Sequence, residues 1–168
     1  GVLKRPQFMQ KRTVCSFPKG HEIEGGFLRV RDEGDKITMS IKIMEGSGII
    51  EGQKEIELTV NSYADATQFL QTIGAEPRSE QESKRELWQL NDTEIMIDWW
   101  PFLEPFIEIE GPSEDAVKNV ANILDCNWED AIFDSVDGKY SKIYNISKDR
   151  VNNYTPKILF NMENPFTE

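Results

Sequence analysis

The sequence predicts an α+β domain built on an antiparallel β-barrel with flanking helices. Three observations support this fold class. Short segments alternate apolar and polar residues, two longer segments repeat apolar residues at helical spacing, and the polar faces of several strands carry charges of both signs. An open antiparallel sheet with one face in water would give the same alternation. The closed barrel with a polar interior is therefore the more specific of two interpretations that the strand pattern leaves open.

The strands follow from alternation with a period of two. It is clearest at residues 37–43, where four apolar residues share one face and Thr38, Ser40 and Lys42 share the other. An Asn91-Asp92 turn is expected to join two neighbouring strands. The pattern predicts a basic loop at residues 1–11 and a polar turn at residues 76–83. The glycines within residues 46–52 predict a flexible loop. The predicted strands are 10–17, 27–31, 37–43, 55–60, 84–90, 93–99 and 106–110.

Two helices are predicted from apolar stripes and capping residues. One covers residues 62–73, where Asn61 or Ser62 can cap the start and Gly74 ends the helix. The other begins after Ser113 and reaches residue 124. Shorter helical pieces are expected at residues 128–133 and 140–146, on either side of an Asp137-Gly138 turn. We expect one domain over residues 1–151, followed by a tail over residues 152–168 that is partly ordered at best.

Composition narrows the functional classes. A formal charge of −11 argues against a general nucleic-acid or anionic-membrane surface, so a polyanion would need a local basic cluster. No apolar run approaches the roughly 20 residues of a membrane span, and no signal peptide is evident, which favours a cytoplasmic protein. Cys15 and Cys126 are expected to be unpaired thiols, and His21 a loop residue. The oligomeric state is left open.

The charged strand faces point to a chemistry. Arginine and lysine bind phosphate oxygens, and clustered carboxylates hold a hard cation such as Mg²⁺ or Mn²⁺. Phosphoryl transfer uses both, because the cation and the basic groups neutralise the charge that develops on the phosphate oxygens. The interior would therefore suit a metal-bound triphosphate. The residues on these faces are Arg29, Arg31, Lys42, Glu55, Glu57, Arg85, Asp98, Glu108 and Glu110.

A set of short motifs resembles the CYTH family, also called the triphosphate tunnel metalloenzymes. They are LRVR at residues 28–31, the strand at 38–42, EIE at 55–57, KREL at 84–87 followed by Trp88, Asp98, and FIEIEG at 106–111. Their order matches that of the family over roughly residues 1–144. The family includes class IV adenylate cyclases, thiamine triphosphatases and inorganic triphosphatases, so the resemblance implies a tunnel-shaped barrel that takes a small-molecule triphosphate and Mg²⁺ or Mn²⁺.

The resemblance also implies roles for individual residues. The residues that would bind the triphosphate are Arg29, Arg31, Lys42, Arg85 and, as a further candidate, Lys84. The residues that would serve the metal are Glu108, Glu110, Asp98 and Glu57, with Asp98 either a ligand or a positioning group and Glu55 a possible neighbour on the rim. No catalytic residue is identified.

One family motif is missing. The family carries a Glu-x-Glu-x-Lys strand that supplies metal ligands and a lysine, and the sequence has no such strand. Glu22-Ile23-Glu24 is followed by two glycines, so the motif is not transferred to it. We therefore expect the first strand and helix of the family to lie upstream of Gly1, and natural loss of this strand is the alternative.

The leading hypothesis is metal-dependent hydrolysis of a nucleotide or other triphosphate, so the complete protein is expected to be an enzyme. Two alternatives stay open. A class IV type adenylate cyclase would use the 3′-hydroxyl of the nucleotide in place of water. A binding module would hold polyphosphate or a nucleotide without turnover, since the missing motif would leave the metal with too few ligands.

Overall fold

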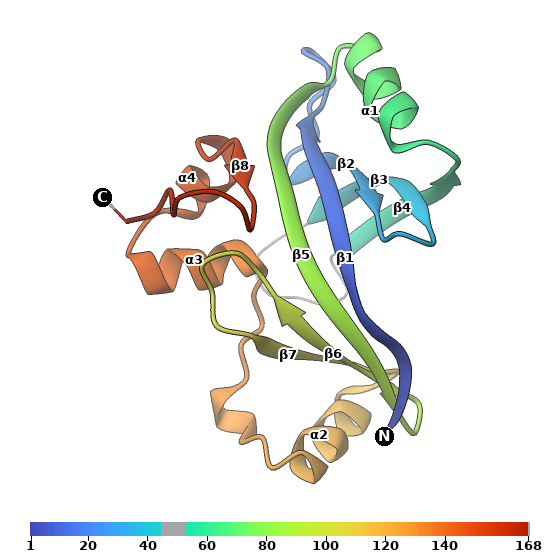
Figure 1. Ribbon diagram of the computed structural model, residues 1–168, viewed down its shortest axis with the longest axis vertical. Helices are drawn as coiled ribbons and strands as arrows, with labels where there is room; N and C mark the ends of the chain where they lie inside the picture. Colours follow the sequence, from blue (N-terminus) through green and yellow to red (C-terminus); the bar gives the residue numbers. More distant parts are fainter. Residues whose placement is uncertain (45–52, 168) are drawn as a thin grey trace.

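The computed structural model describes residues 1–44 and 53–167, and its centre is one eight-stranded sheet (Figure 1). Its strands are β1 (Val2–Ser16), β2 (Gly26–Asp32), β3 (Ile37–Met44), β4 (Gln53–Val60), β5 (Glu76–Leu90), β6 (Thr93–Trp99), β7 (Phe106–Glu110) and β8 (Lys157–Ile158). Its helices are α1 (Tyr63–Thr72), α2 (Glu114–Ile123), the 3₁₀ turn η2 (Trp128–Asp130), α3 (Val136–Tyr144) and α4 (Lys148–Asn153). The α+β class is confirmed. The predicted glycine loop over residues 46–52 lies outside the described residues.

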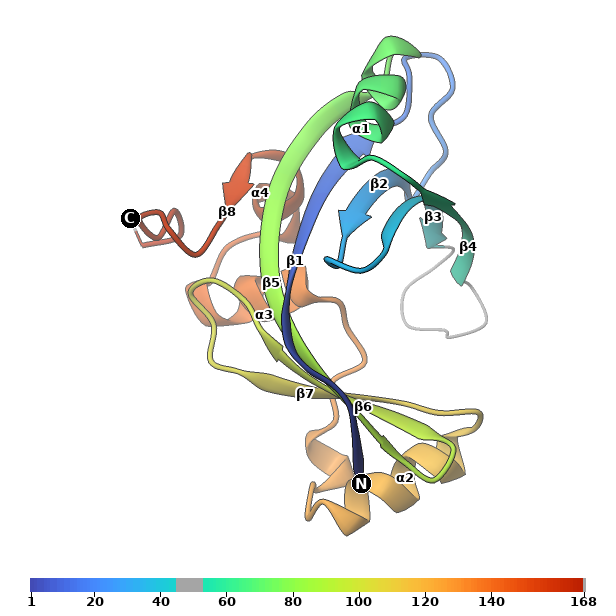
Figure 2. The same ribbon diagram turned by 45° about the vertical axis from the view of Figure 1, so that its right-hand side comes forward.

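A long ribbon of two strands forms the spine of the sheet. β1 and β5 each have 15 residues and pair antiparallel from Val2↔Gln89 to Ser16↔Glu76. The strand order is β4-β3-β2-β1-β5-β6-β7, so β1 is the central strand of this path. β2 pairs with the C-terminal part of β1, and β6 pairs with the C-terminal part of β5. Figures 1 and 2 show the result, in which β2–β4 leave one end of the spine and β6–β7 leave the other.

The sheet is open, which corrects the closed barrel expected from the sequence. The path ends at β4 on one side and β7 on the other, and in the described residues each of these strands pairs with one neighbour only. A barrel requires its two end strands to pair with each other. The charged faces therefore belong to a sheet that bends around a hollow without closing.

Two predictions at the spine were wrong. Residues 1–11 were expected to be a loop and residues 76–83 a turn, yet both lie in long strands. Backbone pairing explains the difference, because each polar segment gains its ladder of hydrogen bonds from the other. The β1–β5 register shifts around Pro6, where the missing N–H interrupts the ladder. The predicted Asn91-Asp92 turn is confirmed, and Asn91 adopts a left-handed conformation with φ of 55°.

Helix α1 covers the face of the sheet that we call the outer face. Its N-cap is Ser62, whose Oγ accepts a hydrogen bond from the backbone N–H of Asp65 at 3.1 Å, as predicted. Residues of α1 pack against buried residues of β1 and β2. This outer core contains Cys15, Leu28, Val30, Ala66, Leu70 and Ala75.

Helix α2 packs against β6 and β7 at the other end of the spine. It begins after Ser113, whose Oγ accepts from the N–H of Ala116 at 3.2 Å, which confirms the predicted cap. Cys15 is buried and Cys126 half-buried, and both thiols are free, as expected. None of the helices formed by the described residues is long and apolar enough to cross a membrane.

The C-terminal residues form a second core with the end of β6. Ile158 lies in β8, which adds in parallel to β5, and Phe166 packs between the rings of Tyr140 and Tyr144. The expected tail is thus anchored over its described length, whereas the domain boundary at residue 151 stays a prediction. Asp137 and Gly138 were expected to form a turn but lie in the first turn of α3. The buried members of this core are Trp100, Tyr140, Val151, Ile158 and Phe166.

Candidate anion-binding site

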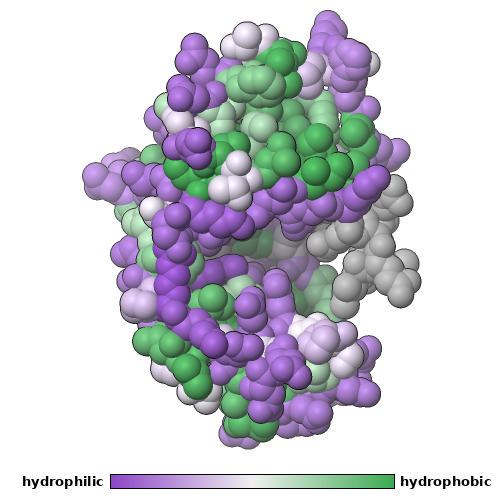
Figure 3. Space-filling view, turned by 90° about the vertical axis from the view of Figure 1, so that its right-hand side faces the viewer, coloured by the Kyte–Doolittle hydropathy of each residue, from purple (hydrophilic) through white to green (hydrophobic). Residues whose placement is uncertain are grey.

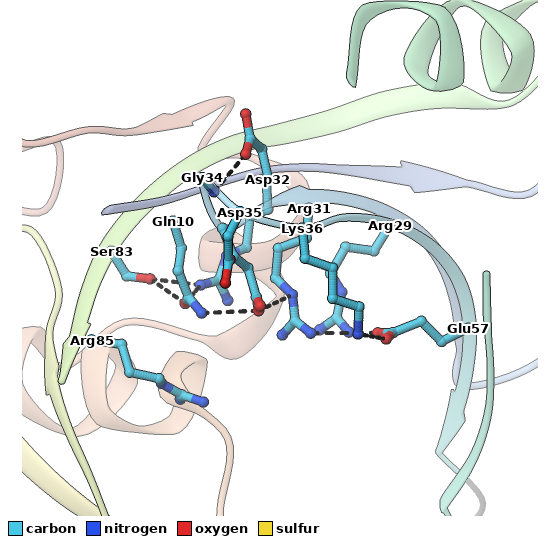
Figure 4. A network of polar contacts seen from close by, with 12 residues as sticks. Gln10, Arg29, Arg31, Asp32, Gly34, Asp35, Lys36, Glu57, Ser83 and Arg85 are labelled. Carbon is cyan, nitrogen blue, oxygen red and sulfur yellow. Dashed lines mark hydrogen bonds and ion pairs between the residues drawn. The ribbon is translucent and has the colours of Figure 1, made fainter. Parts of the chain in front are cut away.

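Four arginines share one face of three adjacent strands, and we call them the arginine cluster: Arg12 on β1, Arg29 and Arg31 on β2, and Arg85 on β5. Arg12 lies directly opposite Arg31 in the β1–β2 register. The cluster occupies the inner face, opposite the one that α1 covers, because neighbouring residues such as Leu28 and Val30 point into the outer core. Figure 4 shows Arg29, Arg31 and Arg85 extending toward the same space.

The two arginines of β2 reach across β3 to acids on β4. Arg29 Nη2 lies 2.7 Å from Glu55 Oε1, and Arg31 Nη2 lies 3.4 Å from Glu57 Oε2. Arg31 Nε also lies 3.0 Å from Glu33 Oε1. Burial and the nearby charge of Arg31 lower the pKa of Arg29. The pairs on this side are partly solvent-exposed, so a ligand could exchange with the carboxylates at modest cost.

Arg85 is held by acids on the other side of the spine. Its Nε and Nη2 donate to Asp98 Oδ1 and Oδ2 at 2.7 and 2.6 Å, and Nη2 also donates to Glu108 Oε2 at 2.8 Å. Burial opposes the charge of Arg85, but the hydrogen bonds and charges of Asp98 and Glu108 outweigh it and raise the pKa of Arg85. The same burial, together with the charge of Asp98, raises the pKa of Glu108.

Arg12 differs from the other three because its contacts are neutral. Its Nη2 donates to Gln10 Oε1 at 2.8 Å and to Ser83 Oγ at 2.6 Å. Its guanidinium carbon lies 4.5 Å from the ring centroid of Trp100. Ser83 in turn donates to Gln10 at 3.0 Å, and Gln10 Nε2 donates to Glu33 Oε1 at 3.2 Å. This network fixes the position of the guanidinium and leaves its charge in place.

Several buried polar atoms of the inner face have no hydrogen-bond partner among the residues that the structure describes. They include Nε of Arg12, Nε of Arg29, Thr38 Oγ1 and Ser40 Oγ. Thr38 and Ser40 lie on β3 directly opposite Arg31 and Arg29. Buried donors of this kind are normally satisfied. A ligand rich in acceptor oxygens would match them.

The two predicted lysines lie on different faces. Lys42 is opposite Phe27 on β2 and Glu55 on β4, which places it on the inner face beyond Arg29. Lys84 precedes Arg85 and therefore points the other way, where its Nζ lies 4.9 Å from the ring centroid of Phe160. The structure therefore brings Lys42 to the face of the arginine cluster but not Lys84.

The predicted metal ligands lie in two places. Glu108 and Glu110 alternate along β7, and Asp98 is on the adjacent strand β6. Glu57 lies on β4, at the opposite edge of the sheet, where Lys36 Nζ is 2.8 Å from its Oε1. Within residues 1–44 and 53–167, no three carboxylate, thiol or imidazole groups come together in a way that could hold a metal ion by themselves.

Solvent reaches this face through a hollow. Figure 3 shows it between the part of the molecule around β2–β4 and the part around β6, β7 and α2, with hydrophilic residues along its rim. The side chain of Arg85 is 22% exposed and that of Glu108 is 40% exposed, whereas that of Asp98 is 3% exposed. A ligand could thus meet the arginines and Glu108 directly, with Asp98 behind Arg85.

Sequence reasoning missed the Arg12 site. Arg12 lies in the strand predicted over residues 10–17, but it was given neither a face nor a role. Its alternation with Thr13 and Cys15, which are both buried on the outer face, was the signal that could have placed it inward. Gln10 and Ser83 carry no such signal, since only the β1–β5 register brings them together.

Solved structures of similar fold come from several organisms. A conserved hypothetical protein from Pyrococcus furiosus has a TM-score of 0.64 at 18% identity, covering 80% of this chain and 83% of its own. The PH1012 protein from Pyrococcus horikoshii OT3 has a TM-score of 0.63 at 18% identity, covering 77% and 80%. A candidate adenylate cyclase from Vibrio parahaemolyticus has a TM-score of 0.55 at 14% identity, covering 73% and 70%. At these identities the likeness concerns the fold alone.

One curated relative was found by sequence, a probable transporter MCH1 from Gibberella zeae, which is 28% identical over 102 residues. The match covers 58% of this chain, and the chain spans only 18% of that protein. The family comparison reaches further. The model of the CYTH domain matches residues 19–134, which include β2 to α2 and every predicted site residue, but not β1. The chain is therefore a member of the CYTH domain family.

Proposed function

We propose that this protein binds the phosphate chain of a small-molecule triphosphate on its inner face and, with a divalent cation, hydrolyses a phosphoanhydride bond. The observation that carries the proposal is the convergence of Arg29, Arg31 and Arg85 on one solvent-accessible hollow. Membership of the CYTH family supports it. Guanidinium groups bind phosphate oxygens through two parallel N–H donors, which gives both affinity and orientation.

The arginines have distinct parts in this proposal. Arg29 and Arg31 exchange their partly exposed carboxylate partners for phosphate oxygens, and Lys42 adds a charge at the β3 side. Arg85 keeps Asp98 behind it, because both oxygens of that carboxylate accept from the same guanidinium. Asp98 therefore positions Arg85, whose remaining donors face the ligand. Lys84 has no part, since it lies on the other face.

The acids differ in how well they fit a cation. Asp98 does not fit as a ligand, because it is nearly buried and both of its oxygens are engaged by Arg85. Glu57 does not fit either, since it lies at the far edge of the sheet and pairs with Lys36. Glu108 and Glu110 share a face of β7 and fit the usual mode of Mg²⁺, which binds one or two protein carboxylates together with phosphate oxygens of the substrate. Mg²⁺ or Mn²⁺ held there would neutralise charge on the phosphate chain.

The reaction that follows is attack of water on a terminal phosphorus and departure of the rest of the chain. Negative charge collects on the transferring and leaving oxygens, and the arginines and Lys42 lie where they would stabilise it. Electrostatic positioning of this kind accounts for most of the catalysis in phosphoryl transfer. No side chain is assigned as a general base.

The test is a product analysis of the purified chain. ATP, thiamine triphosphate and inorganic tripolyphosphate are incubated with Mg²⁺ or Mn²⁺, and released phosphate, pyrophosphate and cyclic nucleotide are quantified. Phosphate release that falls at least tenfold in Arg29→Gln and Glu108→Gln, but not in the exposed control Glu104→Gln, supports the proposal. Cyclic nucleotide with pyrophosphate would instead identify a cyclase. Tight binding by calorimetry without any product would identify a binding module.

A further inference from the structure

Arg12 stands apart from the rest of the arginine cluster in its lack of a counter-charge. Arg29, Arg31 and Arg85 each lie within 3.4 Å of a carboxylate oxygen. Arg12 is held by a carboxamide, a hydroxyl and an aromatic ring, and in the described part of the chain it forms no ion pair. These partners orient the guanidinium without neutralising it.

The acids nearest to Arg12 are already paired with other groups. Asp98 on β6 holds Arg85, and Glu33 pairs with Arg31 and reaches Arg12 only through Gln10. The acids of β4 and β7 lie at the edges of the path, three strands from β1. In the described residues, the charge at the centre of the site therefore has no carboxylate in direct contact.

The surroundings of Arg12 also oppose its charge. Burial, followed by the charges of Arg29, Arg31 and Arg85, lowers the pKa of Arg12 to about 9. The guanidinium is still protonated at neutral pH. Like charges directly opposite each other on neighbouring strands destabilise a sheet, and Arg12 and Arg31 form such a pair. An anion on the inner face would remove this cost, and it would also give the buried Nε of Arg12 an acceptor.

We infer that Arg12 is a polyphosphate-binding residue that joins the two halves of the site, contacting the phosphate chain between the Arg29/Arg31 side and the Arg85 side. The inference rests on the proposed function and adds a residue outside the segment that the CYTH model matches. β2, β1 and β5 are successive strands, and Arg85 lies four residues along β5 from Gln81, the residue opposite Arg12, so the arginines are spread over at least two interstrand spacings, roughly 10 Å. A ligand that uses all of them must be an extended polyanion, and a single phosphate could meet only part of the arginine cluster.

A purely structural role for Arg12 makes the opposite predictions. If the guanidinium served only to stack on Trp100 and to link Gln10 with Ser83, its loss would lower stability and leave anion affinity unchanged. If Arg12 is a binding residue whose charge is unfavourable in the empty site, its loss weakens anion binding and leaves the stability of the fold unchanged or raises it. The two roles therefore separate in a pair of measurements on the same variants.

The experiment measures calorimetric binding of inorganic tripolyphosphate, pyrophosphate and orthophosphate to the chain, without divalent cations. The variants are Arg12→Gln, Arg12→Lys and Arg29→Gln. The matched control is Lys11→Gln, which removes the same charge from an exposed side chain on the outer face of the same strand. We expect Arg12→Gln to bind tripolyphosphate about 10- to 100-fold more weakly, as loss of hydrogen bonds to a charged group implies. The same variant should lose less affinity for orthophosphate than for tripolyphosphate. Arg12→Lys should recover part of the affinity, and Lys11→Gln should stay within about twofold of the wild type.

The possible outcomes separate the inference about Arg12 from the proposed function. A thermal midpoint of Arg12→Gln at or above that of the wild type, together with weakened tripolyphosphate binding, supports the inference. Affinities of Arg12→Gln and Arg12→Lys equal to that of Lys11→Gln, while Arg29→Gln binds weakly, would overturn the role of Arg12 and leave the proposed function standing. If the wild type itself fails to bind tripolyphosphate, both the proposed function and the inference are wrong.

Discussion

Replacing Asp98 with alanine should destabilise the fold, because it removes the carboxylate that holds Arg85. The side chain of Asp98 is 3% exposed, and both of its oxygens accept hydrogen bonds from Arg85, at 2.7 and 2.6 Å. Without Asp98, the guanidinium keeps only its contact with Glu108, at 2.8 Å. The change therefore leaves a partly buried arginine with one of its two acids.

The size of the effect follows from burial. Removing one partner of a buried ion pair costs about 3–5 kcal/mol, since the other charge is left unpaired. Arg85 is 22% exposed and retains Glu108, so we expect the lower limit, about 3 kcal/mol of unfolding free energy. In a chain of 168 residues each kcal/mol shifts the thermal midpoint by about 2–4 °C, so Asp98→Ala should melt about 6–12 °C below the wild type.

A double-mutant cycle isolates the pair. Chemical denaturation of Asp98→Ala, Arg85→Met and the double variant gives three free energies of unfolding. The double variant should be less destabilised than the sum of the single variants, by about 2 kcal/mol, because each single change already breaks the contact. Glu104→Ala, an exposed acid in the loop after β6, is the control and should shift stability by less than about 0.5 kcal/mol. Additive free energies of unfolding, or a thermal midpoint of Asp98→Ala within about 2 °C of the wild type, would refute the argument that the buried pair of Asp98 and Arg85 stabilises the fold.

Three further predictions concern other parts of the molecule. Phe166→Ala should lower the unfolding free energy, measured by urea denaturation, by about 3–5 kcal/mol, because the Phe166 side chain is buried in the C-terminal core and only 4% exposed. A loss below about 1 kcal/mol would mean that the C-terminal segment adds little to the stability of the fold. The hydrogen bond from Lys148 lowers the pKa of Asp134, so this pair stabilises the fold above the ordinary carboxyl pKa, and the benefit is lost as the pH falls through the lowered value. Asp134→Asn should reduce the thermal midpoint by about 1–3 °C at pH 7 and by progressively less as the pH is lowered below the ordinary carboxyl pKa. A shift that does not change with pH would contradict the pairing. Gly26→Ala should lower the unfolding free energy, measured by chemical denaturation, by about 1–3 kcal/mol, since the added Cβ would lie 3.0 Å from the Ile23 carbonyl oxygen. An unchanged unfolding free energy would show that the backbone at Gly26 shifts easily.

The parts of the fold that the sequence predicted are those with strong local signals. The strand at 37–43 alternates over its whole length, and Ser62 and Ser113 both precede apolar stripes and cap the helices that they were expected to cap. Strands were predicted at 10–17 and 84–90, but the other halves of the spine, residues 2–9 and 76–83, were missed because β1 and β5 are rich in polar residues at both faces. Their structure depends on pairing between segments about 70 residues apart, and no local pattern reports a pairing of that range.

The site was predictable only to the level of strand faces. Alternation placed Arg29 with Arg31 and Glu108 with Glu110, and the structure brings each pair to the inner face. It could not assign acids to arginines, because those contacts cross strands that are remote in the sequence. Lys84 was a further candidate beside Arg85, but adjacent residues of a strand point to opposite faces, and the structure places Lys84 on the other face.

Binding of a polyanion by a chain of formal charge −11 needs a physical explanation, and the distance between the bound anion and most of the acidic residues provides one. Charges separated by more than about 8 Å are largely screened at physiological ionic strength. The acids beyond that range repel an approaching triphosphate only weakly, whereas at contact the anion meets several guanidinium groups inside a hollow. Acids on β4 and β6 pair with the arginines at the flanks of the arginine cluster, and in the described residues Arg12 at its centre forms no ion pair. The net charge then governs the long-range repulsion, and the strand order governs where the anion can bind.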